Sequence, residues 1–381
     1  MSLVLGYSNE AVRILGLLAL NQFIASLLLF FRSNISGLQL YTADSIISVI
    51  DRFLMIVFCG VLLWTEILPF KINIQVFALL QTFAYAVTCL IAIAVLLKKK
   101  GTISFKKTPF FSLDMLRKSF PFAVLGFIMV IYSRIDAVLI ERMLPNGALA
   151  AGKYAQSFRI YDAVTMISVL FASLLLPMFA NLLTNKKDIK GIVKLAFSLL
   201  FTGTAILAIT FSIFATPVLN VLYKESFPES VNVFVLLSIC IVPVSVTYIF
   251  GTLLTADGKL RVLIIVAIIT LFINIVLNIT LIPILGISGA ALSALVSQLI
   301  ASTAQVLLCF KIYKFKFNWK HLLPYMVFVT FSILIAVLFN SFQMNLGLKL
   351  LSSLSISLFA AFFLKIISLR ELFEVFLPEN D

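Results

Sequence analysis

The feature that most restricts the fold is a series of long apolar runs joined by short polar connections. A membrane-spanning helix needs about 20 consecutive apolar residues, and about eleven runs in this sequence meet that requirement. We expect spans at 11–31, 44–66, 73–97, 119–140, 152–180, 192–217, 231–253, 261–284, 286–310, 322–340 and 346–367. The runs are apolar on all faces, which indicates helices rather than the alternating strands of a membrane barrel. The sequence therefore predicts an all-α integral membrane protein.

The composition agrees with a membrane protein and argues against a soluble one. Hydrophobic residues make up 62% of the chain and charged residues 12%, whereas soluble domains contain about 25% charged residues. The net charge of +13 lies mainly in short loops between apolar runs, which is typical of cytoplasmic loops rather than of a nucleic-acid-binding surface. We therefore expect membrane lipids around the chain and no nucleic-acid partner.

Residue types that usually carry catalysis or bind metals are scarce. The four cysteines lie inside apolar runs and form no C-x-x-C pair, and His321 is the only histidine. The sequence also contains no Walker motif and no GxSxG motif. We therefore expect no metal site, no cofactor and no enzymatic activity.

The basic residues predict how the chain is oriented. Lys and Arg are enriched in cytoplasmic loops, and the connection at 98–118 is rich in both. We interpret residues 98–118 as a basic cytoplasmic linker that follows a three-span part at 1–97. Because three spans precede the linker, the start of this sequence is expected outside the cytoplasm and the end inside.

Four charged residues inside the fourth and fifth spans are the strongest candidates for a functional site. A charge in the bilayer is costly unless it is paired or faces water. At 1.5 Å per residue, Arg134, Asp136, Arg159 and Asp162 occupy one depth band on adjacent spans. They could form a polar cavity wall that receives an anionic head group. Alternatively, interhelical ion pairs, such as Asp136 with Arg159, could serve packing alone.

Two further polar pairs are weaker candidates for a cavity. Asp51 and Arg52 lie about two helical turns from the cytoplasmic face, where the long side chain of an arginine can reach the interface. Asn274 and Asn278 are four residues apart on one face of a span. They could line a cavity, but hydrogen bonds between helices explain them equally well.

The connection between the eighth and ninth spans reads LIPILGISGAALSAL. We expect a tight external turn at Pro283 and Gly286. Gly289, Ala290 and Ala294 follow, and small residues at this spacing allow helices to approach closely. This segment therefore predicts packing rather than chemistry.

Three segments together resemble a known family: FPFAVLGFIMVIYSRIDAVLIERML, GKYAQSFRIYDAV and LLTADGKLRVLIIVAIITLFINIVLNITLIPILGISGAALSALVSQL. They are similar, over most of residues 115–310, to the polysaccharide-exporter branch of the multidrug/oligosaccharidyl-lipid/polysaccharide superfamily, the bacterial flippases of lipid-linked sugars. The resemblance implies two six-helix lobes in a V around a central cationic cavity, with two further helices in some members. By this comparison Arg134 and Asp136 lie on the first helix of the second lobe, and Arg159 and Asp162 on its second.

The front of the sequence departs from that pattern. Residues 1–97 would form a partial first lobe with three spans, 119–310 the six-helix second lobe, and 311–381 two extra helices and a cytoplasmic tail. A complete first lobe has six helices and starts in the cytoplasm. About three N-terminal helices are therefore expected to be missing, through a truncated gene, a late start or a fragment.

The resemblance implies a flippase that moves an undecaprenyl-diphosphate-linked oligosaccharide, such as an O-antigen repeat unit, across the bacterial inner membrane by alternating access. Arg134 and Arg159 would contact the diphosphate or acidic sugars, because arginine binds phosphate oxygens bidentately. Asp136 and Asp162 would couple transport to a proton or sodium gradient. A polysaccharide polymerase and glycosyltransferases are the expected partners.

Three alternatives can be compared with this function, and the sequence argues against the second of them. A drug or small-cation exporter of the same superfamily would have a net acidic cavity. An integral-membrane glycosyl polymerase or ligase would need a long external loop, and the sequence has none. A non-functional truncated remnant is the third.

Overall fold

A computed structural model describes residues 9–38, 40–64, 73–100, 113–223, 227–315 and 322–367. Every regular element in these ranges is a helix, and eleven helices are long and apolar enough to span a membrane. The predicted all-α membrane fold is thus confirmed. The chain divides into two compact units, Met1–Phe110 and Phe111–Asp381. This boundary falls within the predicted linker, of which residues 101–112 lie outside the described ranges.

The first unit contains α2 (Asn9–Gly37), α3 (Tyr41–Trp64) and α4 (Ile74–Lys100). These helices pack on one another around a small core that includes Leu28, Ile35 and Ala92. A polar contact inside the bundle joins α2 to α4, because the side-chain amide of Asn21 donates to the carbonyl oxygen of Ala78 at 3.1 Å. An interhelical hydrogen bond of this kind fixes the rotation of two apolar helices in a membrane.

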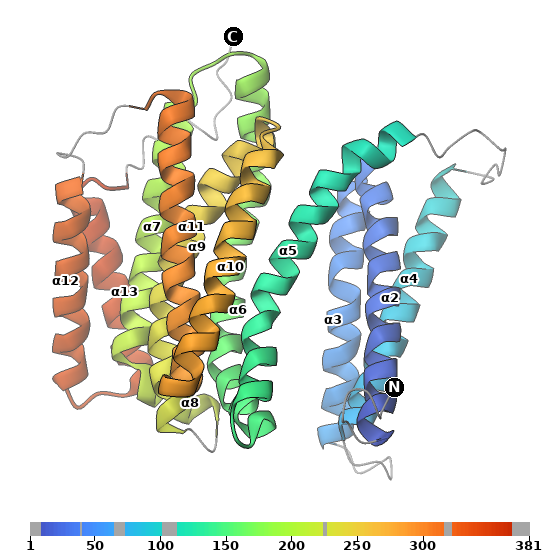
Figure 1. Ribbon diagram of the computed structural model, residues 1–381, viewed down its shortest axis with the longest axis horizontal. Helices are drawn as coiled ribbons and strands as arrows, with labels where there is room; N and C mark the ends of the chain where they lie inside the picture. Colours follow the sequence, from blue (N-terminus) through green and yellow to red (C-terminus); the bar gives the residue numbers. More distant parts are fainter. Residues whose placement is uncertain are drawn as a thin grey trace. The chain divides into compact units, whose positions relative to one another are not determined.

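The second unit contains α5 (Leu113–Met143), α6 (Gly147–Thr184), α7 (Lys190–Ile213), α8 (Ala215–Leu222), α9 (Pro228–Ala256), α10 (Leu260–Leu285), α11 (Ile287–Tyr313), α12 (Leu322–Ser341) and α13 (Leu346–Phe363). Helix α9 is the central element and packs against α6, α7 and α11. Accordingly, 61% of the most apolar 18-residue stretch of α9 is buried, against 17% of the corresponding stretch of α5. Figure 1 shows α12 and α13 on one side of this bundle, next to α7, and α5 on the other side.

Two predicted boundaries in this unit are wrong. The span expected at 192–217 stops at Ile213, and the separate helix α8 begins at Ala215. The physical reason is Pro217, which has no N–H to continue the ladder and fits only the first turn of a new helix. The turn expected at Pro283 and Gly286 lies at Gly286, which has φ 61°, while Pro283 is still inside α10.

Candidate functional site

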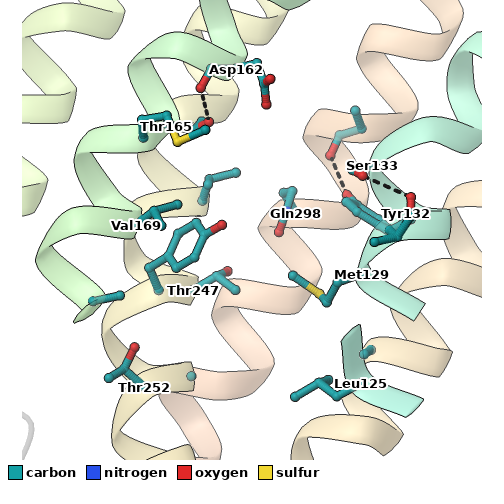
Figure 2. Close-up of a pocket in the computed structure, with 18 of the residues that line it drawn as sticks. Leu125, Met129, Tyr132, Ser133, Asp162, Thr165, Val169, Thr247, Thr252 and Gln298 are labelled. Atoms are coloured by element: carbon teal, nitrogen blue, oxygen red, sulfur yellow. Dashed lines mark hydrogen bonds between the residues drawn. The ribbon is translucent and has the colours of Figure 1, made fainter. Parts of the chain in front are cut away.

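The second unit encloses a cavity of about 640 Å³. Its walls come from α5, α6, α9, α10 and α11, and Figure 2 shows residues from these walls facing a common space. A cavity of this size is within the range of about 300–1,000 Å³ that is usual for small-molecule sites. The lining combines many apolar side chains with a smaller set of polar ones, which is also usual for such sites.

Asp136 is the buried charged group of this cavity. Its side chain lines the space, and the residue is only 5% exposed. The hydroxyl of Tyr154 on α6 donates to one carboxylate oxygen at 3.2 Å, and the side-chain amide of Asn278 on α10 donates to the other at 2.8 Å. These neutral donors replace part of the hydration that a buried carboxylate loses.

The hydrogen bonds continue from Asn278 to a fourth helix. The amide of Asn278 also contacts the side-chain oxygen of Asn274 at 3.1 Å, and the amide of Asn274 donates to the hydroxyl of Ser297 on α11 at 3.3 Å. The hydroxyls of Ser297 and Tyr132 lie 2.8 Å apart. The resulting Asp136 network, made of Asp136, Tyr132, Tyr154, Asn274, Asn278 and Ser297, joins α5, α6, α10 and α11.

Asp162 on α6 lines the same cavity in a different environment. The hydroxyl of Thr165 donates a hydrogen bond at 2.8 Å to the backbone carbonyl of Asp162 rather than to its carboxylate. The side chain is half-buried. Figure 2 shows it at one end of the space, away from Leu125 at the other end.

The structure brings some of the predicted site residues together and separates others. Asp136 and Asp162 line the cavity, whereas Arg134 and Arg159 are exposed and do not line it. Arg134 lies near its edge, with its guanidinium carbon 5.7 Å from the ring centre of Phe158, a lining residue. An ion pair between Asp136 and Arg159 is not found among the described residues, because the carboxylate is bonded to neutral donors instead.

The weaker candidates are also divided. Asn274 and Asn278 are fully buried members of the Asp136 network, so the interhelical hydrogen bonding that was one interpretation of them is confirmed. Asp51 and Arg52 lie on α3 of the first unit. Asp51 is buried, whereas the Arg52 side chain is 77% exposed and pairs with Asp51 at 3.4 Å.

The charged residues in the lining of this second-unit cavity are acidic. Two carboxylates, Asp136 and Asp162, belong to its lining, and no Lys or Arg does among the described residues. No group of three or more potential metal ligands was found in the described ranges either. The cavity is therefore acidic, with one carboxylate held in a network and one more accessible.

Sequence reasoning missed the uncharged polar residues of the site. Tyr132 and Tyr154 belong to the Asp136 network, and Gln298, Gln305 and Thr247 line the cavity. The two glutamines carried a usable signal, because amides are unusual in an apolar span and a spacing of seven residues places both on one helical face. The tyrosines carried none, since aromatic residues are common throughout these spans.

Comparison with known proteins gives a family match and two similar structures. Residues 6–183 match the family described as Polysaccharide biosynthesis protein. The predicted resemblance is confirmed. The match includes the three helices of the first unit and ends at the close of α6, whereas the resemblance was noted over residues 115–310. No curated protein matches the sequence.

Two solved structures share the fold. The lipid II flippase MurJ in an inward closed conformation has a TM-score of 0.70 and 14% identity, covering 97% of this chain and 77% of its own. The Vibrio cholerae MATE transporter VcmN, in a variant form, has a TM-score of 0.59 and 18% identity, covering 82% of this chain and 72% of its own. At these identities the likeness concerns the fold.

Proposed function

We propose that this protein is a flippase that moves an undecaprenyl-diphosphate-linked oligosaccharide, such as an O-antigen repeat unit, across the bacterial inner membrane by alternating access. The family match over residues 6–183 carries this proposal, because that family is described by polysaccharide biosynthesis. The fold similarity to a lipid II flippase and the cavity inside the second unit support it. A polysaccharide polymerase and glycosyltransferases are the proposed partners.

Arg134 and Arg159 are proposed to bind the diphosphate. Both are exposed on neighbouring helices, α5 and α6, and Arg134 reaches the edge of the cavity at Phe158. The planar guanidinium group binds phosphate oxygens through paired hydrogen bonds and stays charged in a membrane environment. In this arrangement the head group binds outside the acidic cavity rather than within it.

Asp136 is proposed to couple transport to a proton or sodium gradient. Its carboxylate is buried, accepts hydrogen bonds from the neutral side chains of Tyr154 and Asn278, and belongs to a network that joins four helices. Binding a proton or a cation there would neutralise a charge that the membrane interior disfavours. Asp162, which faces the same cavity, is the proposed second coupling group.

Complementation of a flippase-deficient strain tests the function. The intact chain should restore surface polysaccharide, and replacing Arg134 and Arg159 together by alanine should abolish it at equal membrane levels of the protein. Arg142→Ala is the matched control, because Arg142 is an exposed arginine at the end of the same helix α5. Normal polysaccharide with the double variant would rule out the proposed diphosphate contact.

One observation favours a second candidate, a drug or small-cation exporter. The cavity lining has two carboxylates and no basic residue among the described positions, and such a cavity attracts organic cations. Cells that express this chain would then expel tetraphenylphosphonium, and Asp162→Asn would stop the efflux. Efflux without any effect on surface polysaccharide would favour the exporter over the flippase.

A further inference from the structure

One wall of the cavity is made of uncharged hydrogen-bonding groups from two neighbouring helices. Helices α9 and α11 pack side by side, and both contribute to the lining. We call the following residues the polar wall: Thr247, Thr252 and Thr255 of α9, and Gln298 and Gln305 of α11. Figure 2 shows Thr247, Thr252 and Gln298 facing the same space. Gln298 and Gln305 are seven residues apart and share one face of α11.

Two atoms of the polar wall lack a hydrogen-bond partner among the residues that the structure describes. Gln298 and Gln305 are 8% and 7% exposed. In the described part of the chain, the side-chain oxygen of Gln305 and the hydroxyl of Thr247 accept or donate no hydrogen bond. Buried polar groups are almost always hydrogen-bonded in native proteins. Gln305 and Thr247 both belong to the cavity lining, so a small rotation of either side chain would let a ligand supply the missing partner.

The backbone of α9 makes room for one of these amides. A Cβ atom on Gly251, which also lines the cavity, would lie 3.1 Å from the side-chain oxygen of Gln305. That distance is shorter than an ordinary contact, so any larger residue would displace the amide. Glycine at this position therefore allows Gln305 to lie against α9 at the cavity wall.

The chemistry of the polar wall selects among ligand classes. An amide offers donors and an acceptor, and a threonine hydroxyl offers both, which matches the alternating donors and acceptors of a sugar. Phosphate would require cations, and the lining holds none among the described residues. A lipid tail would leave the amides without partners. Tyr161 and Tyr248, which also line the cavity, offer aromatic faces with a polar tip.

We propose that the polar wall binds neutral sugar residues, through their hydroxyl and acetamido groups, during transport. The proposal rests on the proposed function, and it divides the substrate between two places. The diphosphate contacts Arg134 and Arg159 outside the cavity, while part of the glycan enters it. Asp162, at one end of the cavity, accepts hydrogen bonds from further hydroxyl groups.

Binding of soluble sugars to the full chain in lipid nanodiscs tests the proposal. The probes are lactose and N,N′-diacetylchitobiose, with tetraphenylphosphonium as the cationic comparison, and saturation-transfer NMR gives the dissociation constant. Wild-type protein should bind at least one disaccharide saturably. Gln298→Leu and Gln305→Leu should each weaken that binding about tenfold, as expected for loss of a hydrogen-bonding group in a buried site. The control Thr280→Val, on the exposed face of α10, should bind as wild type.

Two results would overturn the proposal. One is the absence of saturable disaccharide binding by the wild-type protein. The other is unchanged binding by the Gln298→Leu, Gln305→Leu double variant, provided that its unfolding midpoint matches that of wild type. Gly251→Ala keeps both amides but displaces Gln305, so it should weaken binding several-fold without unfolding the protein.

Failure of this proposal differs from failure of the proposed function. A wild-type chain that binds a disaccharide yet restores no surface polysaccharide would count against the flippase but support the polar wall. Normal polysaccharide from the double glutamine variant would count against the polar wall but leave the flippase intact.

Discussion

The first half of α11 packs closely against neighbouring helices, whereas the second half contributes to the cavity lining. In the first half, small buried residues such as Ala290 and Ala291 pack against neighbouring helices. A Cβ on Gly289 would lie 2.3 Å from the carbonyl oxygen of Leu281. The backbone of α10 therefore occupies the space that a side chain at position 289 of α11 would need. In the second half, Gln298 and Gln305 line a cavity. The first half of α11 (the closed half) is thus packed closely against α10, whereas part of the second half (the open half) borders the cavity.

The Asp136 network lies at the transition between these halves. Ser297 and Ala294 of α11 both contact Tyr132 of α5 through its hydroxyl, at 2.8 and 3.5 Å. The network therefore holds α5 and α10 on α11 at the level of Ser297. Changes to the network, the closed half and the open half should differ in both size and kind.

The largest effect on stability is expected from Asp136→Leu. This change leaves the donors of Tyr154 and Asn278 buried without an acceptor, and each such group costs about 1–3 kcal/mol. Asp136→Asn keeps an acceptor oxygen and should cost clearly less, while transport should be lost in both variants if the carboxylate couples an ion. Unfolding in mixed micelles with increasing SDS gives the free energies. Equal stability of the two variants would show that the network does not support the bundle.

The closed half should be the next most sensitive region. Gly289→Ala forces a methyl group onto the backbone of α10 and should destabilise the fold by about 1–3 kcal/mol, as overpacking does. Gly203→Ala on α7 is the matched control, since nothing lies within 4 Å of its added Cβ. The control should be neutral or slightly stabilising, because alanine favours helix by up to about 1 kcal/mol over glycine. Similar unfolding curves for both variants would remove the distinction between the two halves.

The open half should tolerate the same substitution. Gly251→Ala meets only the flexible Gln305 amide, so we expect a stability change below about 1 kcal/mol, in line with a local rearrangement. Its effect should appear in disaccharide binding instead. Measuring unfolding and disaccharide binding on one preparation separates the effect on stability from the effect on binding. A large loss of stability would mean that the cavity wall is packed as tightly as the closed half.

The number and nature of the membrane-spanning helices in the described ranges could be predicted because the membrane imposes their length and composition. The break at Phe214 was missed because a run such as 192–217 remains apolar through Pro217, and hydropathy does not register a lost backbone donor. Helix α6 extends to Thr184, past the expected end of its span at residue 180, because the backbone hydrogen bonds continue beyond the apolar run. Hydropathy finds the bilayer-spanning part of a helix but not where its hydrogen bonds end.

The site could be predicted only for groups whose presence in a membrane is costly. Asp136 stood out by its charge, and the structure gives it partners on α6 and α10 that no local pattern identifies. Arg134 and Asp136 are two residues apart, which turns their side chains by about 200°, and accordingly one is exposed and the other is buried. The polar wall depends on which faces of α9 and α11 meet, and that is decided by packing.

Translocation by the purified full chain in proteoliposomes tests the flippase function most directly. The liposomes carry a fluorescent undecaprenyl-diphosphate-linked oligosaccharide, and a membrane-impermeant quencher reports the fraction that reaches the outer leaflet. We predict that wild-type protein moves the lipid faster than protein-free liposomes, and that Asp136→Asn, which keeps an acceptor oxygen for the network, does not. Movement no faster than in protein-free liposomes, together with uptake of tetraphenylphosphonium by the same vesicles, would contradict the flippase and favour a cation exporter.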